Sequence, residues 1–411
     1  MSTPGHRLLS GIRVIDFGWV WAGPLVTSVL ADLGAEVIKI EHSTRLDNGR
    51  LRGRAKVWAD VQAPSIELVP YFHTLNRGKE SVSINIKHPR GLELVRSIIE
   101  VSDVLVENLS RGALDKVGLG YQDLSRVNPS LVYVSVSAAG NVGPRRAARS
   151  YAPITSSLAG LEGLVGYPGS VPIGMMTFGL SDGNAGSHAL LAVLAGMYFH
   201  SRTKRGLYID VSQLDAMLAV MAEPILEWTL AKHKPEAPGN RRRDMAPHDI
   251  YGAAGTDQWL SISVMDDAMW LRLVDAMERP PWALLKNFET VNGRLKQQSF
   301  IDRHLGAWTA RLPRDEVVAL LHSHSVAASP VLSLDDARRS SYFQERHLTT
   351  TVNHPLVGDE EVFSLPWKMS DDNRIPVAAP MLGQHTDAVL QDLLGLPGSD
   401  IESLRADGVI D

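Results

Sequence analysis

The sequence predicts an α/β protein whose first part carries an open and mostly parallel sheet. Short runs rich in Val and Ile alternate with longer helix-like runs, which is the pattern of consecutive β-α-β units. The chain has 411 residues, of which 44% are hydrophobic and 21% charged, and this suits a globular protein of about two domains. We therefore expect parallel strand pairing with right-handed crossovers.

The first β-α-β unit lies at the amino-terminal end. Residues 11–17 read as a buried strand, and Gly23-Pro24 is expected to break the chain after it. Residues 25–33 then read as a helix, and residues 34–41 as the second strand.

The alternation continues beyond this unit. Further strands are predicted at 81–86, 102–107 and 131–136, and helices at 89–101 and 112–117. Ligands of open α/β sheets bind at the carboxyl ends of the strands. The loops expected at those ends are 18–23, 41–47, 108–111 and 137–143.

The second half predicts a smaller domain inserted into the first. Helices are expected at 184–202, 215–232, 267–277 and 387–394, strand-like alternation at 251–264, strands near Val352 and Val362, and a polar loop at 233–243. The expected division is a large domain at 1–200, a connection at 201–224, a small domain at 225–325 and a return to the large domain at 326–411.

Composition excludes several classes of protein. A net charge of -5 and a pI of about 6.3 give no bias towards nucleic acid or membrane. Without cysteine there are no disulfides and no thiolate metal sites, and no metal ligand spacing occurs. The opening residues lack the apolar core of a signal peptide, and the longest apolar run, 189–199, is too short to span a bilayer. We therefore predict a cytoplasmic location.

The segment Gly179–Gly186 has three interpretations. As Gly-x-Ser-x-Gly it predicts a serine hydrolase with Ser181 as nucleophile, preceded by a strand at 171–178. Alternatively, Asp182 is the nucleophile at a helix start, where the helix terminus would lower its pKa and keep it ionised. In the third interpretation, Ser181 or Asp182 only caps the helix. Capping and a catalytic Asp182 are compatible.

A set of ordered motifs narrows this choice. They are Leu9–Phe17, Trp21–Pro24, Ala31–Glu41, Leu75–Lys79, Val106–Asn108, Gly112–Leu114, Asn128–Leu131, Arg205-Gly206, Asp210–Ser212 and Ala379–Thr386. Together they resemble the class III CoA-transferases, a family that includes formyl-CoA transferase, carnitine CoA-transferase and α-methylacyl-CoA racemase. The resemblance covers nearly the whole chain.

The resemblance implies a Rossmann-like large domain built from both chain ends, a smaller α+β domain and an interlocked dimer. Asp182 takes the place of the family's catalytic aspartate. It would form a mixed anhydride with the donor acyl group and then an aspartyl-CoA thioester, before the acceptor acid reverses the steps. Coenzyme A and acyl-CoA would be substrates, and no tightly bound cofactor or metal is implied.

The resemblance also implies site residues. The CoA contacts would be Val20, His42, Leu75, Asn76, Arg77, Asn108, Leu109, Arg111, Ala113, Lys116 and Ser137. The substrate pocket would include Trp21, Arg50, Tyr151 and Gly183. His42, Ser137 and Trp21 stand where formyl-CoA transferase has arginine, lysine and glutamine, which argues against formyl and oxalate specificity.

Residues 240–264 resemble a branch that acts on dicarboxylic or aromatic acids with succinyl-CoA. This predicts transfer from succinyl-CoA to a bulky acid such as benzylsuccinate, in a homodimer or a heteromer with a homologous subunit. Three alternatives stay open. They are a racemase-like enzyme, a non-catalytic subunit of a heteromer, and the serine hydrolase. The racemase-like alternative is weakened because Tyr151 stands where the racemase branch has a histidine.

Overall fold

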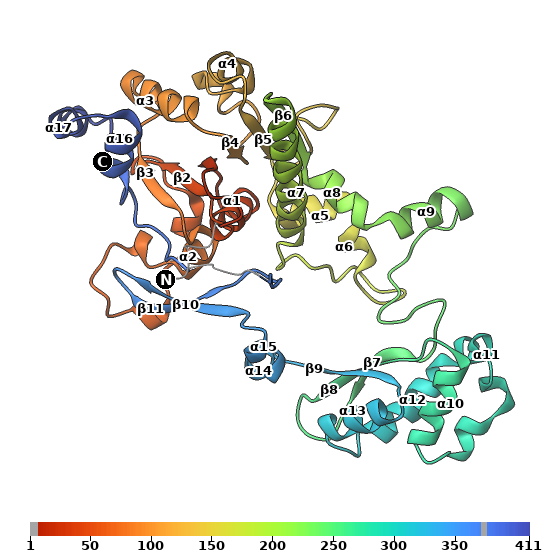
Figure 1. Cartoon of the computed structure of the whole chain (residues 1–411). Coiled ribbons are helices and arrows are strands. Elements are labelled where there is room, and N and C mark those ends of the chain that lie inside the picture. Colours follow the sequence, from red (N-terminus) through yellow and green to blue (C-terminus); the bar gives the residue numbers. More distant parts are fainter. Residues whose placement is uncertain (1–6, 371–375) are drawn as a thin grey trace. The chain divides into compact units, whose positions relative to one another are not determined.

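The computed structural model describes residues 7–370 and 376–411, which fall into two compact units (Figure 1). The larger unit comprises residues 1–161, 175–232 and 347–411, and the smaller comprises 162–174 and 233–346. The first six residues, which contribute to the predicted cytoplasmic location, lie outside the described residues. Among the described helices, none combines the length and apolar character needed to cross a membrane.

A six-stranded sheet forms the centre of the larger unit, and all its pairings are parallel. Its strands are β1 (Arg13–Phe17), β2 (Glu36–Glu41), β3 (Glu80–Ser83), β4 (Val104–Glu107), β5 (Val132–Ser137) and β6 (Leu207–Ser212). The order β3-β2-β1-β4-β5-β6 reverses between β1 and β4. The predicted parallel sheet is confirmed, and β6 adds a strand that the sequence pattern did not predict. Ligands of such sheets bind at the point of reversal.

Helices cover both faces of this sheet. The helices of the larger unit are α1 (Ala22–Asp32), α2 (Pro70–Asn76), α3 (Pro89–Glu100), α4 (Tyr121–Val127), α5 (Ala152–Ala159), α7 (Leu180–Thr203), α8 (Gln213–Val220), α9 (Ala222–Ala231), α16 (Thr386–Leu394) and α17 (Gly398–Ala406). Val14 packs with α1 and α7, whereas Ile15 packs with α3, α4, α16 and α17. Neighbouring residues of a strand point to opposite faces, so each face of the sheet has its own core.

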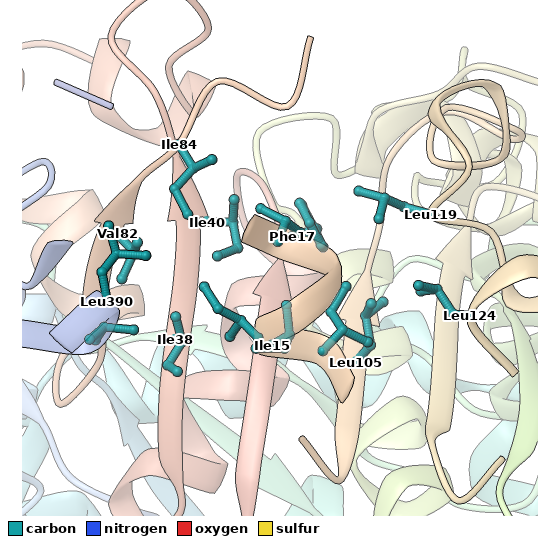
Figure 2. Close-up of a cluster of buried hydrophobic side chains, with 14 of the residues drawn as sticks. Ile15, Phe17, Ile38, Ile40, Val82, Ile84, Leu105, Leu119, Leu124 and Leu390 are labelled. Carbon is teal, nitrogen blue, oxygen red and sulfur yellow. The ribbon is translucent and has the colours of Figure 1, made fainter. Parts of the chain in front are cut away.

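The carboxyl-terminal segment completes the core of the larger unit. Leu390 of α16 lies beside Val82 and Ile38 in the cluster of buried side chains in Figure 2. The Asn85 amide donates to the Val409 carbonyl at 2.8 Å, and the His385 amide donates to the Ser81 carbonyl at 2.9 Å. The hairpin of β10 (Thr349–His354) and β11 (Gly358–Phe363) also belongs to this unit.

Several predicted boundaries differ from the structure. Helix α1 starts at Ala22 and includes Pro24, because a first-turn residue needs no amide donor. The helix predicted at 215–232 is two helices, which meet at Met221 just ahead of Pro224. The helix predicted at 112–117 is only a 3₁₀ turn at Asp115–Val117.

The smaller unit is an antiparallel sheet with helices. Its strands, in the order β7-β8-β9, are β7 (His248–Gly252), β8 (Trp259–Ser263) and β9 (Ala327–Val331). Its helices are α10 (Asp267–Ala276), α11 (Val291–Lys296), α12 (Gln298–Thr309), α13 (Arg314–Ser323), α14 (Leu334–Arg339) and α15 (Ser341–Glu345). The short α6 (Leu161–Leu164) lies where the two units join along the chain. The hydrophobic core of the smaller unit includes Trp270, Phe288 and Ile301.

Candidate active site

A cavity of about 420 Å³ lies at the carboxyl ends of β1, β4 and β5 in the larger unit. All four loops predicted at the strand ends contribute to its lining. They supply 19–21, Arg45, 108–111 and 137–138, and the lining also takes in 148–151, Asp182 and Gln213. The cavity therefore occupies the reversal point of the strand order.

Asp182 lies in the first turn of α7 and is the only carboxylate among the described residues that line this cavity. Its Oδ1 accepts a hydrogen bond from Gln213 Nε2 at 3.0 Å. Burial raises the pKa of Asp182 to about 6, and the Gln213 hydrogen bond and the Arg52 charge oppose this only in part. The prediction that the helix start lowers this pKa is therefore wrong, because desolvation dominates. At neutral pH the group is still mostly ionised.

The serine nucleophile does not fit this geometry. Ser181 is completely buried, and its hydroxyl donates to the Ala152 carbonyl at 2.9 Å. The described backbone at 171–179 contains no strand, which a nucleophile elbow requires. The interpretation that Ser181 or Asp182 caps the helix is also wrong, because the N-cap residue of α7 is Gly179 and no side chain caps this helix.

Trp21 shapes the cavity beside Asp182. A Cβ on Gly179 would lie 2.3 Å from Cζ3 of the Trp21 ring, so only glycine permits this packing at the start of α7. A Cβ on Gly183 would meet nothing within 4 Å. The predicted pocket residue Gly183 is therefore unobstructed at its Cα, but it is not among the residues that line the cavity.

Asn108 fixes the loop after β1. Its Oδ1 accepts from the Trp19 amide at 2.7 Å, and its Nδ2 donates to the Trp19 carbonyl at 2.9 Å. Both ends of the side-chain amide are thus used within the protein. Asn108 lines the cavity, but its hydrogen bonds position Trp19.

A buried charge network supports the same loop. Lys39 Nζ lies 3.0 Å from Asp47 Oδ2 and donates to the Gly18 carbonyl at 2.6 Å. Asp47 Oδ1 accepts from the Val20 amide at 2.8 Å. Val20 has a φ of 65°, which is strained for a β-branched residue and needs such support. Both charged side chains are only 1% exposed.

A second cavity of about 90 Å³ adjoins the first, since Trp19, Arg45 and Leu109 line both. Predicted residues His42 and Ala113 belong to it, among apolar side chains such as Phe17, Ile40, Ile84 and Ile86. The Arg45 guanidinium lies 4.9 Å from the centre of the Trp19 ring. Arg45 and Trp19 thus stand between the two cavities.

Other predicted site residues lie outside both cavities. Leu75 and Asn76 are buried, and Arg77 pairs with Asp32 and lines a different cavity with Lys368. Lys116 is exposed in the 3₁₀ turn.

Arg50 is buried and does not line the substrate cavity. Its guanidinium binds Glu41 at 2.9 Å and Glu67 at 2.7 Å. The prediction that Arg50 belongs to the substrate pocket is therefore wrong, because its guanidinium is already paired with two carboxylates.

The residues of the predicted set that the structure brings together around this cavity are Asp182, Trp21, Tyr151, Val20, Asn108, Leu109, Arg111 and Ser137. The structure adds residues that the motifs missed. Gln213 follows a strand that the sequence pattern does not predict. Arg146 and Arg149 belong to a basic run in the loop after β5, and this run is the signal in the sequence that indicates them. The lining thus contains four arginines and, among the described residues, one carboxylate. Among the described residues, no group of side chains is suited to hold a metal ion.

Comparisons with known proteins give the family. The model of CoA-transferase family III matches residues 9–386. A succinyl-CoA–D-citramalate CoA-transferase of Chloroflexus aurantiacus is 29% identical over 98% of both chains. The alpha subunit of a succinyl-CoA–L-malate CoA-transferase of the same organism is 30% identical over 100% of this chain and 95% of that one. A CAIB/BAIF family protein from Brucella suis has a similar structure, with a TM-score of 0.83 and 27% identity over 93% of this chain and 98% of that one. The chain therefore belongs to CoA-transferase family III.

Proposed function

We propose that this enzyme transfers coenzyme A from an acyl-CoA donor to a carboxylic acid, with Asp182 as the covalent nucleophile. The observation that carries the proposal is Asp182, the single carboxylate among the described residues of a cavity lined by arginines, which is partly buried yet mostly ionised at neutral pH. A desolvated carboxylate is a stronger nucleophile than a hydrated one, and nearby arginines attract anionic substrates.

The reaction starts when an Asp182 oxygen attacks the donor thioester carbonyl. The carbon–sulfur bond breaks, and a mixed anhydride and CoA thiolate result. The thiolate then attacks Cγ of Asp182, which releases the donor acid and leaves an aspartyl-CoA thioester. The acceptor carboxylate repeats these steps in reverse order. The covalent relay conserves the thioester free energy that hydrolysis would lose.

The two adjoining cavities suggest how an acyl-CoA binds. The smaller cavity, with apolar walls and His42, would take the adenine end of CoA. The pantetheine arm would then pass Trp19 and Arg45 and place the thioester near Asp182. Arg111 would meet a CoA phosphate.

The substrates follow from the lining and the relatives. Both relatives use succinyl-CoA by name, and we propose the same donor here. Arg45, Arg146 and Arg149 line the cavity, and they would hold a second carboxylate of the acceptor. Trp21 and Tyr151 give the cavity aromatic surface, which suits a bulky acceptor such as benzylsuccinate.

The assembly and location are part of the same proposal. One relative is named as the alpha subunit of its enzyme. We propose that this chain works in the cytoplasm as a homodimer or with a homologous subunit. No histidine lines the cavity among the described residues, and racemisation needs an acid/base pair, so transfer is favoured over racemisation.

Covalent trapping tests the proposal. The enzyme is incubated with succinyl-CoA, acetyl-CoA or benzoyl-CoA and hydroxylamine, and then digested for mass spectrometry. We expect a hydroxamate on the peptide that contains Asp182, and no such product in Asp182→Ala. An unmodified Asp182 peptide with every donor would contradict the mechanism and favour the non-catalytic subunit.

The pH dependence should report the Asp182 pKa. Only the ionised carboxylate attacks, so kcat/KM for the donor is expected to fall as the pH drops through about 6. Above this pH the profile should reach a plateau. A profile that continues at full rate well below pH 6 would contradict the role of burial at this group.

Gly179→Ala is expected to lower kcat because the new methyl group collides with the Trp21 ring. Moving the first turn of α7 by about 1 Å displaces Asp182, and such a misplacement costs about 100-fold in rate. Steady-state kinetics measures the loss, and thermal unfolding should show that the fold is retained. Unchanged kinetics would mean that Trp21 does not help position Asp182.

A further inference from the structure

Gln213 holds one particular oxygen of the nucleophile. Its Nε2 donates to Oδ1 of Asp182 at 3.0 Å, and its side chain lines the same cavity. The residue is only 8% exposed, so little water competes for this hydrogen bond. Oδ2 is thereby left as the oxygen that attacks.

The local fold fixes this amide. β6 ends at Ser212, whose Oγ accepts from the Asp215 amide at 3.1 Å and starts α8. Gln213 is the first residue of that helix. Asn184 of α7 donates to the Ala216 carbonyl at 2.8 Å, which ties the two helices together. Asp182 and Gln213 thus sit on neighbouring helix starts joined by a hydrogen bond.

The proposed reaction needs two different oxyanion sites. In the first and last steps the substrate carbonyl is attacked, and the negative charge develops on the substrate oxygen. In the two middle steps Cγ of Asp182 is attacked, first by CoA thiolate and then by the acceptor carboxylate. The charge then develops on the Asp182 oxygen that is not part of the breaking bond.

We propose that Gln213 is a catalytic residue that stabilises this oxyanion on Asp182 itself, an inference that rests on the proposed function. The thiolate forms a bond to Cγ, and the electron pair of the C=O bond moves onto Oδ1, where the Gln213 N–H already points. When the pair returns, the Cγ–Oδ2 bond breaks and the donor acid leaves with that oxygen. In the next step the acceptor oxygen adds to Cγ and the thiolate leaves.

If Gln213 only supported the fold or tuned the charge of Asp182, the pH dependence of its variants would be different. The Gln213 hydrogen bond also lowers the pKa of Asp182, against the larger effect of burial. If that were its whole contribution, a variant would recover full activity at a pH well above 6. Loss of an oxyanion donor persists at every pH and slows only the steps that attack Cγ.

The test is the donor half-reaction in Gln213→Met, which retains the size of the side chain but removes the N–H donor. Enzyme and succinyl-CoA are mixed without acceptor, quenched in acid and analysed by intact-protein mass spectrometry, alongside acetyl-CoA and benzoyl-CoA. The wild type should form the CoA adduct. In the variant its formation should slow by about 10²–10³-fold, the usual effect of one oxyanion donor. An acyl adduct or hydrolysis of the donor should replace it.

Two variants control the experiment. Ser187→Ala removes an exposed hydroxyl of α7 that donates to the Gly183 carbonyl and lines neither cavity, and it should form the CoA adduct within about threefold of the wild-type rate. Gln213→Leu provides a second loss of the donor, without a new charge beside Asp182, if the methionine variant does not fold. The KM for the donor should change little in both Gln213 variants.

The outcomes separate the inference from the proposed function. A CoA adduct that forms at the wild-type rate in Gln213→Met, or that recovers at high pH, overturns the role of Gln213 and leaves the function standing. A wild-type enzyme that forms no adduct with any of the three donors overturns the proposed function, and the role of Gln213 falls with it.

Discussion

Replacing Asp182 with asparagine is expected to abolish CoA transfer and, at neutral pH, to make the protein more stable. Loss of a covalent nucleophile lowers kcat by about 10⁴-fold or more. The stability gain follows from burial, which raises the pKa of this carboxyl from 3.8 to about 6 and so penalises its charged form in the folded state. At neutral pH the penalty is on the order of 1–3 kcal/mol, and a neutral amide removes it while still accepting from Gln213.

The sign of the stability effect can be checked against pH. Between about 4 and 6 the folded protein binds more protons at Asp182 than the unfolded chain, so the wild type gains stability as the pH falls through this range. The advantage of Asp182→Asn should therefore be largest above pH 6 and vanish below pH 4. Urea unfolding of both proteins at several pH values measures it.

Ser181→Ala is the matched control one residue away. It removes a buried hydroxyl that only donates to the Ala152 carbonyl, so we expect a loss of about 1 kcal/mol in stability and nearly full activity. Asp182→Ala guards against slow conversion of asparagine back to aspartate. Full activity in both Asp182 variants with an inactive Ser181→Ala would restore the hydrolase interpretation.

Regular local patterns made most of the larger unit predictable from sequence. β1, β2, β4 and α3 follow from apolar runs that the structure buries where expected. The predicted start of α7 is four residues late, because Gly183 is a poor helix former, although the prediction accepts Gly186 inside the helix. A Cβ on Gly186 would lie 2.8 Å from Leu25, so this glycine serves the close packing of α7 on α1. Tertiary packing overrides propensity there.

The site was predictable only where its function depends on a local motif. Asp182 was found because it follows a recognisable glycine-rich segment, and its first-turn position emerges from a helix the sequence partly predicted. Arg50 was wrongly predicted in the substrate pocket because its two ion-pair partners, Glu41 and Glu67, cannot be recognised as such from the sequence. Glu67 lies in a separate segment of the chain. Nothing in the sequence pattern indicated Gln213 as a site residue, because β6, the strand that it follows, was not predicted.

Replacing Asp47 is expected to lower both stability and activity. Its carboxylate pairs with Lys39 in the buried charge network and accepts a hydrogen bond from the amide of Val20, which lines the cavity. Asp47→Ala leaves Lys39 buried without the carboxylate that lies 3.0 Å from its Nζ, and breaking such a pair costs about 3–5 kcal/mol. The Asp47 charge, with those of Asp16 and Glu41, outweighs burial and holds the pKa of Lys39 above its usual value. Chemical denaturation of the variant measures the loss.

A second substitution separates stability from catalysis at this position. Lys39→Met combined with Asp47→Ala removes both charges, and buried pairs replaced by apolar groups lose little stability, so the double variant should recover most of it. Activity should stay low, because the Val20 amide still lacks its acceptor and Val20, with its φ of 65°, is free to relax. Asp47→Asn, which keeps an oxygen for that amide but loses the charge, should show the reverse, with activity retained and stability reduced. If the double variant regained both, the strained turn after β1 would have no part in shaping the site, and the network would serve the fold alone.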